Sequence, residues 1–199
     1  HILLMNPSPV STDDNAKSTQ YFYEPFGNLS RTRDPLGNQI DISYDTLGRK
    51  TLLKDPDLGT WQYWVDPVGR TYQQQSAKGQ LTSFEFDNLS RLVRRLEPDQ
   101  DSRWVYDSAV MGVGKLAEAY TLIGGATKDY RRVNSYDSYS RLASVTTSLD
   151  WDYVTAFTFD GFGRASAQNH TRRVRGGTGG LTTSVYSSYN AQGFVDKTY

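Results

Sequence analysis

The sequence predicts an all-β protein built as an array of antiparallel β-hairpin repeats. One short phrase recurs along the chain: an aromatic residue, an acid, two variable residues, a small residue, and then usually Arg or Asn. Its first four copies begin at residues 23, 44, 65 and 86, an unbroken spacing of 21 residues, and self-similarity at a fixed period of this kind is typical of repeat architectures. Turn residues inside the phrase and alternating apolar residues before it favour strands over helices.

Composition agrees with this fold class. Apolar residues make up 37% of the chain and tyrosine contributes 14 residues, so burial relies on aromatic rings that can also place a polar tip toward water. This favours a thin, curved sheet over a thick globular core. Lys plus Arg and Asp plus Glu both number 22, so there is no basic surplus to neutralise a nucleic-acid backbone, and we expect no nucleic-acid partner. Cysteine is absent, which removes disulfides and thiolate metal sites, and no apolar run is long enough to span a bilayer.

The chain is predicted to have a short arm and one long array. Residues 1–20 form a polar lead-in arm, because residues 6–19 are rich in Ser, Thr, Asn, Asp and Pro. Residues 21–199 form one repeat array, since no linker of different composition interrupts them. The array opens without an initiator Met, and residues 196–199 resemble a return strand cut short. We therefore expect a fragment of a longer chain, which in isolation dimerises edge to edge through its unpaired strands.

The repeated phrase predicts a tight turn with a bulge. A type I turn favours Asp at its first position, Pro at its second and Gly at its fourth, and a left-handed Gly makes the common bulged hairpin connection. Residues 34–37 and 66–69 match all three positions, and residues 24–27 nearly match. The acid accepts hydrogen bonds from the turn amides. Ser90 and Ser140 replace the Gly, so those two turns are predicted to be either strained or of a different type.

Each turn is expected to join two short strands. Apolar residues two positions apart precede the turns and share one face of their strand. The pairs are Ile42 with Tyr44, Tyr63 with Val65, Phe84 with Phe86, Trp104 with Tyr106, and Phe157 with Phe159. Stacked repeats would align them as an aromatic ladder, in which each cross-strand pair contributes roughly 0.2–1 kcal/mol beyond an alanine pair. Return strands are predicted at residues 91–96 and 141–146, and second turns at residues 55–59, 77–80, 98–101 and 124–125.

The period loosens past residue 106. An insertion runs through residues 110–116, and insertions in repeat arrays usually form loops on one face. Residues 113–120 are the one stretch considered for a helix, and their glycine content argues against it. Residues 172–180 are predicted to be the most flexible and most basic loop of the chain.

Repeated placement favours a structural role for the motif residues. The motif arginines are expected either to pair with neighbouring acids or to line the surface of the array. The residues to which we assign a repeat-structural role are Tyr23, Gly27, Tyr44, Asp45, Gly48, Arg49, Asp66, Gly69, Arg70, Phe86, Asp87, Arg91, Tyr136, Asp137, Arg141, Phe159, Asp160, Gly163, Arg164, Tyr189 and Gly193.

Catalytic and ligand-binding interpretations have weaker support. The two histidines, His1 and His170, are interpreted as solvated or hydrogen-bonded residues rather than catalytic ones. Paired carboxylates such as Asp13 with Asp14, Asp99 with Asp101, and Asp150 with Asp152 could bind calcium or serve acid/base chemistry, but turns are rich in acids for capping reasons alone. Residues 176–180 lack the Lys-Ser/Thr pair of a phosphate loop. We therefore assign no catalytic residue, no metal ligand and no cofactor, and we expect no enzyme activity in this chain.

With these motifs, the chain resembles the Rhs or YD-repeat family, whose repeat centres on Tyr-Asp-x-x-Gly-Arg followed by an apolar residue. The resemblance covers roughly residues 21–199, and residues 112–116 with 136–142 are similar to the Rhs region of bacterial toxin-complex and polymorphic-toxin proteins, more than to the animal teneurins. In that family a strip of hairpins spirals into a hollow shell around a toxic C-terminal polypeptide. The resemblance implies a secreted or cell-surface scaffold whose partners are neighbouring repeats and an enclosed toxin.

The family often carries an aspartyl self-cleavage motif near the end of its core, with an Asp-Pro-x-Gly-Leu ending. Residues 34–38 and 66–70 share its first part but end in Asn and Arg, and both lie early, so they are interpreted as turns. Two hypotheses remain. The favoured one is a non-catalytic section of a toxin-encapsulating shell. The alternative is a module that binds a cell-surface glycan or a protein through exposed tryptophans, with Trp61, Trp64, Trp104 and Trp151 as candidates.

Overall fold

The computed structural model describes residues 8–12 and 18–199, and every regular element in them is a β-strand. The chain divides into two compact units, residues 1–85 with 96–98 and residues 86–95 with 99–199. Ser8–Thr12 is a strand paired with the one that begins at Ser18, whereas residues 1–7 and 13–17 of the expected lead-in arm lie outside the described part. No helix that could span a membrane occurs among the residues that the structure describes.

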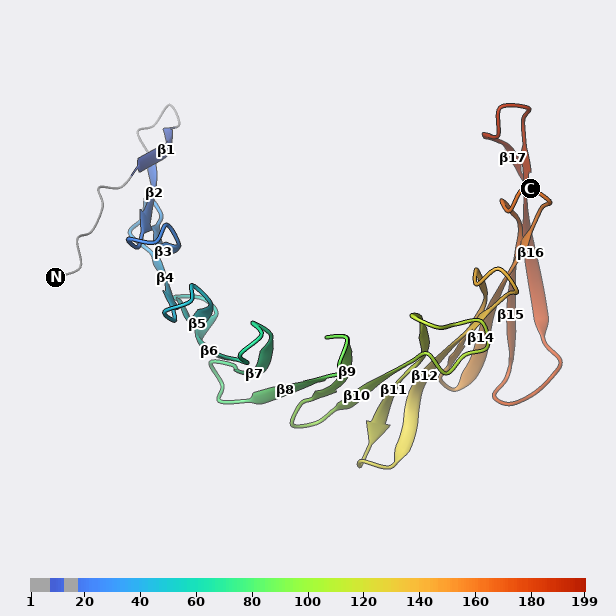
Figure 1. The fold of residues 1–199 in the computed structure, drawn as a ribbon, viewed down its shortest axis with the longest axis horizontal. Helices are drawn as coiled ribbons and strands as arrows, with labels where there is room; N and C mark the ends of the chain where they lie inside the picture. Colours follow the sequence, from blue (N-terminus) through green and yellow to red (C-terminus); the bar gives the residue numbers. More distant parts are fainter. Residues whose placement is uncertain (1–7, 13–17) are drawn as a thin grey trace. The chain divides into compact units, whose positions relative to one another are not determined.

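The first unit is an antiparallel meander in which each strand pairs with the next one along the chain. Its strands are β1 (Ser8–Thr12), β2 (Ser18–Tyr23), β3 (Leu29–Arg33), β4 (Gln39–Tyr44), β5 (Lys50–Asp55), β6 (Gly59–Val65), β7 (Thr71–Gln75) and most of β8 (Leu81–Phe86). Figure 1 shows this succession in blue to green.

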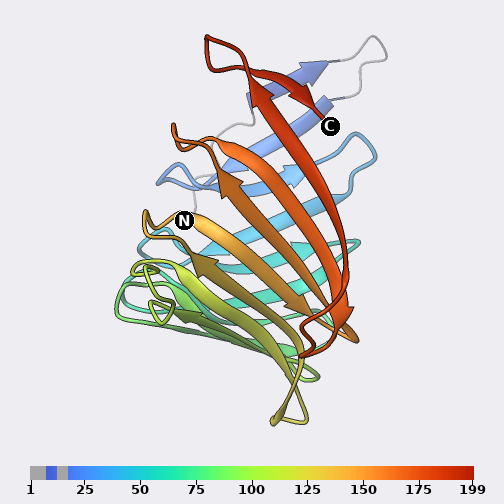
Figure 2. The same ribbon diagram turned by 90° about the vertical axis from the view of Figure 1, so that its right-hand side faces the viewer.

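The second unit repeats the same arrangement with longer strands. It contains most of β9 (Leu92–Leu96), β10 (Asp101–Tyr106), β11 (Leu116–Ile123), β12 (Thr127–Tyr136), β13 (Leu142–Ser148), β14 (Trp151–Phe159), β15 (Ala165–Val174), β16 (Leu181–Tyr189) and β17 (Val195–Thr198). Successive strands pair antiparallel from β10 to β17, and in Figure 2 the strands from β11 to β16 lie side by side. The predicted all-β hairpin array is confirmed.

The structure tests two predictions about the less regular part of the chain. Residues 113–120 form no helix, as their glycine content predicts, and they end a turn and begin strand β11. The predicted loop at residues 172–180 is wrong at its start, because Arg172, Arg173 and Val174 belong to β15 and pair with β14. The loop proper is residues 175–180. Alternation of side chains along β15 continues to its end, so ladder pairing extends the strand through this basic stretch.

The register of the hairpins explains the alternation in the sequence. Side chains opposite each other in a pair share a face, so the register assigns every strand residue to one of two faces. In the second unit, Trp104, Tyr136 and Phe159 share one face, which we call the aromatic face. Asp101 and Asp152 lie on the other, polar face.

The sheet has little core of its own. Among the described residues, the only buried hydrophobic side chains are Ala117 and Ala167, and no large side chain is fully buried. Most residues on both faces are half-buried. A single layer of this kind gains its stability from strand pairing, turns and contacts between neighbouring side chains within the sheet, and these contacts are what the repeated motif supplies.

Candidate functional site: the repeated aspartate–arginine turn

The acid of the motif organises its turn. In all five copies that carry both the aspartate and the arginine, one carboxylate oxygen accepts hydrogen bonds from two turn amides. In the Asp45 turn, Oδ1 accepts from the amides of Leu47 at 2.9 Å and Arg49 at 3.0 Å. The equivalent bonds at the other four copies are 2.8–3.1 Å long. The backbone closes the turn as well, since the amide of Gly48 donates to the carbonyl of Asp45 at 3.0 Å. This is the type I turn that the sequence predicts.

A bulge follows each of these turns. The strand register shifts at the first motif residue in the hairpins closed by the Asp45, Asp66, Asp137 and Asp160 turns, for example between Ser43 and Tyr44 and between Ser135 and Tyr136. The small residue of the motif has positive φ, with +75° at Gly48 and +93° at Gly69. A left-handed fourth residue after a type I turn produces this bulge.

The sequence leaves two alternatives for the turns that contain Ser90 and Ser140, a strained turn or a turn of a different type, and the backbone of these two residues distinguishes them. Both have the left-handed backbone of the glycines they replace, with φ of 62° and 60°, and their amides close the same turn onto Asp87 and Asp137. The turn type is therefore unchanged, and the serines accept the strain that a Cβ brings to this conformation. Ser140 gains a compensating contact, because its hydroxyl donates to the carbonyl of Met111 at 2.8 Å.

The arginine of the motif holds the other carboxylate oxygen. Its Nε donates to Oδ2 of the aspartate four residues earlier, at 2.6 or 2.7 Å in all five copies. These ion pairs are half-buried, with about a quarter of each side chain exposed in the Arg91–Asp87 pair. Hydrogen bonds from the amide of Arg49 and from its side chain hold the pKa of Asp45 below its usual value, although burial opposes them. Each carboxylate is thus fixed in its charged form by its own turn.

The same arginine also contacts the next repeat. The guanidinium carbon of Arg141 lies 3.9 Å from the ring centroid of Phe159, and that of Arg164 lies 4.2 Å from the centroid of Tyr189. Arg91 does the same with Tyr106 at 4.4 Å. Arg91, Arg141 and Arg164 therefore each tie their own turn to the aromatic residue of the following repeat through a cation–π contact.

Arg49 shows what happens where the following aromatic residue is missing. The next motif begins with Val65, which offers no ring, and Arg49 instead donates from Nη1 to the backbone carbonyl of Asp66 at 2.7 Å. The adjacent Lys50 covers the ring of Tyr63, with Nζ 4.2 Å from its centroid. The contact between the Arg49 turn and the next repeat is therefore a hydrogen bond to the backbone of Asp66 instead of a cation–π contact.

The motif tyrosine makes the reverse connection. Its hydroxyl donates to the backbone carbonyl of the first residue after the arginine position of the preceding repeat: Tyr44 to Leu29 at 2.9 Å, Tyr136 to Leu116 at 2.8 Å, and Tyr189 to Ala165 at 2.7 Å. Burial raises the pKa of Tyr44 above its ordinary value, with a smaller contribution from Glu24. Neighbouring repeats are therefore joined both by the arginine and by the tyrosine.

An eighth copy of the turn lies in the insertion after residue 106. The amide of Asp107 donates to the carbonyl of Lys115 at 3.0 Å, as the motif aspartates do to their arginines, and the amide of Gly114 donates to Asp107 Oδ1 at 2.6 Å. Nζ of Lys115 lies 5.0 Å from the ring centroid of Tyr136. Lys115 thus takes the place of the motif arginine in a lengthened turn. This role is not among the sequence-based expectations, although Gly114-Lys115-Leu116 has the order of a Gly-Arg-apolar ending.

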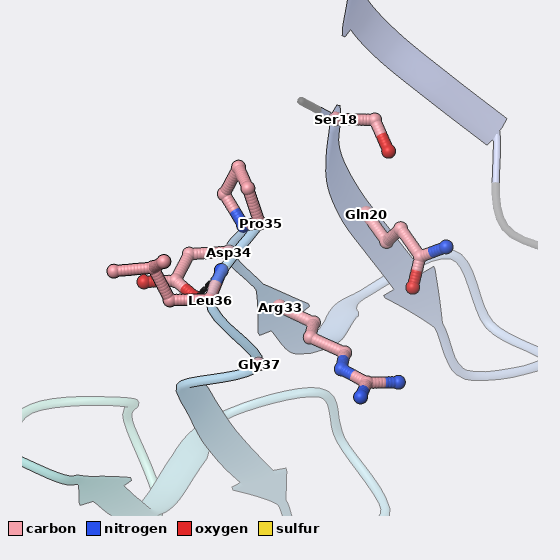
Figure 3. Close-up of a pocket in the computed structure, with 7 residues that line it drawn as sticks. All are labelled: Ser18, Gln20, Arg33, Asp34, Pro35, Leu36 and Gly37. Carbon is pink, nitrogen blue, oxygen red and sulfur yellow. Dashed lines mark hydrogen bonds between the residues drawn. The ribbon is translucent and has the colours of Figure 1, made fainter. Parts of the chain in front are cut away.

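The first and last copies use other polar pairs. Asn28 donates from its side chain to Glu24, and Asn190 Oδ1 accepts from the amides of Gln192 at 3.1 Å and Phe194 at 3.0 Å. The turn at the opposite end of the strands, Asp34–Gly37, is built in the same way, with Asp34 Oδ1 accepting from Leu36 at 2.9 Å (Figure 3). A shallow hollow of about 330 Å³ separates this turn from Gln20, and its lining carries no cluster of titratable groups suited to chemistry.

A row of exposed apolar side chains accompanies the turns. The seven copies of the motif begin at residues 23, 44, 65, 86, 136, 159 and 189. The fourth motif position, just before the small residue, is apolar in six of them, and those six side chains are between 71% and 88% exposed. We call these residues the turn tips: Phe26, Leu47 and Val68 in the first unit, and Leu89, Tyr139 and Phe162 in the second. Within each unit they lie at the same edge of the meander, because alternate turns of a meander fall on the same side. The apolar residue at the fourth motif position is the sequence signal for this row, which is not among the sequence-based expectations.

The remaining candidate residues do not come together as a catalytic or metal site. Nδ1 of His170 lies 3.2 Å from the hydroxyl of Thr155 across a strand pair. Asp101 is held by Arg94 and Arg103, which lower its pKa to about 2, with the hydrogen bond from Arg103 as the main cause. Asp152 accepts from Ser148 and from the amide of Gly176. Within residues 8–12 and 18–199, no group of His, Asp or Glu is arranged to hold a metal ion, while His1, Asp13 and Asp14 lie outside that part.

The tryptophans of the alternative hypothesis differ in their surroundings. Trp61, Trp64 and Trp104 are half-buried, and Trp151 is 37% exposed. The indole N–H of Trp61 donates to the carbonyl of Leu58, and Arg172 covers the ring of Trp151 with its guanidinium carbon 5.1 Å from the centroid.

Comparison with known proteins identifies solved structures that share this fold. No family model matches the sequence, and no curated protein matches it. Solved structures do match: the crystal structure of TcdB2-TccC3 without its hypervariable C-terminal region aligns with a TM-score of 0.70 and 16% identity, over 91% of this chain and 10% of that chain. The TcdB2-TccC3-Cdc42 structure gives 0.69 and 16% over 90% and 10%, and TcdB2-TccC3 gives 0.67 and 17% over 89% and 10%.

These matches confirm the fold expected from the resemblance to the Rhs/YD-repeat family. This chain spans about a tenth of the length of the solved chains that it matches. At this level of identity the likeness concerns the fold, and the residues above give the physical basis for it.

Proposed function

We propose that this chain is a non-catalytic wall segment of an Rhs-type shell, part of a longer secreted or cell-surface toxin protein that encloses a toxic C-terminal polypeptide. The observation that carries the proposal is the two-way link between successive repeats, in which an arginine reaches forward to the next aromatic residue and a tyrosine reaches back. Together with the match to TcdB2-TccC3, this arrangement suits an extended wall better than a pocket for chemistry.

The thinness of the sheet supports the same function. A single layer whose faces and turn tips stay partly exposed is expected to be covered by other parts of a larger assembly. We propose that the turn tips contact another strip of the same wall, and that the motif residues act as its structural links. The alternative function, a module that binds a glycan through aromatic side chains, has support from one groove beside Trp104.

Limited proteolysis of the longer parent protein tests the proposal. We expect its C-terminal polypeptide to resist trypsin while the wall is intact, and to be digested in a variant that combines Asp137→Ala with Arg141→Ala. The matched control is Lys78→Ala, in an exposed turn outside the motif, which should keep the protection. A C-terminal polypeptide that is digested equally fast in the unaltered protein and in the double variant would contradict the shell function.

A further inference from the structure

A groove of about 540 Å³ lies on the second unit across β10, β11 and β12. Its floor is formed by a small residue, because the strand register places Ala119 directly between Trp104 on β10 and Arg132 on β12. An alanine side chain ends at Cβ, so the indole and the guanidinium stand on either side of a hollow. Tyr130 lines the same groove, and its backbone amide donates to the hydroxyl of Thr121 at 3.3 Å.

The lining combines flat rings with polar groups that retain free bonding capacity. Trp104 and Tyr130 supply two aromatic surfaces, and Asp129, Arg132 and Gln100 supply an acceptor and several donors. Among the described residues, the guanidinium of Arg132 makes a single hydrogen bond, from Nε to Asn134 at 3.4 Å. Within the part of the chain that the structure describes, neither the indole N–H of Trp104 nor the carboxylate of Asp129 has a hydrogen-bond partner.

This environment sets Trp104 apart from the other tryptophans discussed above. The indole N–H of Trp61 is used by Leu58, and the ring of Trp151 is covered by Arg172. Arg103, the other cation in the lining, is already bonded to both carboxylate oxygens of Asp101. The groove therefore offers the Nη groups of Arg132 and the carboxylate of Asp129, one charge of each sign, which favours a neutral ligand over a phosphate or another anion.

We propose that this groove, lined by Trp104, Tyr130, Asp129 and Arg132 over the floor of Ala119, binds a neutral β-linked oligosaccharide. A β-linked pyranose presents a flat face of C–H groups that packs on an indole, and a rim of hydroxyls that exchange hydrogen bonds with carboxylate, guanidinium and amide groups. The indole of Trp104 receives the flat face of one sugar ring, and Asp129 and Arg132 bind the hydroxyls at its rim. The site is independent of any enclosed polypeptide.

Isothermal titration calorimetry of the whole chain with two probes, triacetylchitotriose and cellotriose, tests the proposal. We expect one of them to bind with one site per chain. Trp104→Ala should weaken that binding by at least about tenfold, and Ala119→Leu should do the same by filling the floor while leaving both rings in place. The matched control is Trp151→Ala, which removes a more exposed tryptophan of the same unit and should leave the affinity within about twofold.

Urea unfolding of each variant separates loss of binding from loss of folding. If Trp104→Ala proves unstable, Ala119→Leu and Asp129→Asn carry the test. The proposal is overturned if neither sugar binds at millimolar concentration, if Trp104→Ala and Ala119→Leu both bind as well as the unaltered chain, or if Trp151→Ala loses as much affinity as they do. A failure of this kind leaves the trypsin-protection result for the wall segment untouched.

Discussion

The guanidinium of Arg141 lies over the ring of Phe159, 3.9 Å from its centroid, while its Nε donates to Asp137 at 2.7 Å. One side chain therefore fixes a turn and joins that turn to the next repeat. Lysine could supply the charge but not the planar fork that serves both contacts. The five-residue motif turn needs arginine to make both contacts at once, whereas Lys115 in the lengthened turn makes the ring contact to Tyr136.

Arg141→Lys should lower the stability of the second unit. Loss of the ring contact alone is expected to cost about 0.5–1 kcal/mol, since the contact is only partly shielded from water. Urea unfolding followed by circular dichroism measures the change. Lys78→Ala, in a turn outside the motif, is the control and should leave the midpoint unchanged. Equal midpoints for Arg141→Lys and the unaltered chain would show that the arginine contact adds nothing beyond its charge.

Gly69→Ala should destabilise the chain by about 1 kcal/mol for conformational reasons alone. Gly69 has φ of +93°, and a Cβ built on it meets no atom within 4 Å, so crowding does not contribute. Gly161→Ala is a matched control, because it is also in a motif turn, also meets nothing within 4 Å, and has no left-handed backbone. Thermal unfolding should show a lower midpoint for the first variant only. If both variants unfold together, backbone conformation does not set the choice of glycine here.

Tyr136→Phe removes one hydroxyl that donates to the carbonyl of Leu116 at 2.8 Å. We expect a loss of about 1 kcal/mol, because the half-buried carbonyl loses one of its two side-chain donors and keeps only that of Asn134 at 2.9 Å. Tyr139→Phe provides the comparison, since Tyr139 is a turn tip that is 79% exposed. The prediction is contradicted if chemical unfolding gives the same change for both tyrosines.

Stability should fall as the pH drops below about 4. Asp101 and the motif aspartates, including Asp45 and Asp137, have folded-state pKa values below their ordinary one. A carboxylate whose pKa is depressed on folding contributes stability that is complete above its unfolded pKa and is lost as the pH falls through the folded value. For Asp101 that folded value is about 2, so the loss should extend between about pH 4 and pH 2.

Urea midpoints measured across this pH range test the effect. Asp101→Asn should show a lower midpoint at neutral pH and a weaker dependence on acid than the unaltered chain. An unchanged midpoint between pH 6 and pH 2 in the unaltered chain would mean that these carboxylates do not stabilise the fold.

The turn tips offer a test that separates folding from association. Replacing Leu47 and Val68 with Ser should leave thermal stability nearly unchanged, because both side chains are more than two-thirds exposed. If these residues form contacts between strips, sedimentation velocity should show less self-association of the variant at high protein concentration. Association that is equally strong in the variant would assign it to strand edges, such as that of β17, instead.

Much of the local structure could be predicted from the sequence because it depends on residues that are close together in the chain. Asp66, Pro67 and Gly69 define a turn by their own side-chain bonds and backbone preferences, and that turn sets the hairpin. The contacts between repeats were harder to foresee. The reach of Arg141 to Phe159 and of Tyr136 to Leu116 depends on which strands pair and on a bulge that re-aims the aromatic ring.

For two residues, Lys115 and Arg173, the sequence pattern does not predict the observed structure. The sequence predicts an insertion around Lys115, because the lengthened turn hides the motif spacing between Lys115 and Asp107. The sequence predicts a loop at Arg173, because basic residues followed by glycines are typical of one, yet the pairing of Arg173 with Asp152 continues the strand. In both cases the neighbouring strand, rather than the local sequence, determines the structure.

The lengthened turn between Asp107 and Lys115 keeps the same closing hydrogen bond as its five-residue counterparts. Extra residues at this point therefore leave the pairing of the adjoining strands intact. Diversity in length can therefore accumulate at such a bend without a matching change elsewhere. The same bend is a practical place to graft an epitope or a fluorophore-binding peptide, next to Val110, whose side chain is 81% exposed.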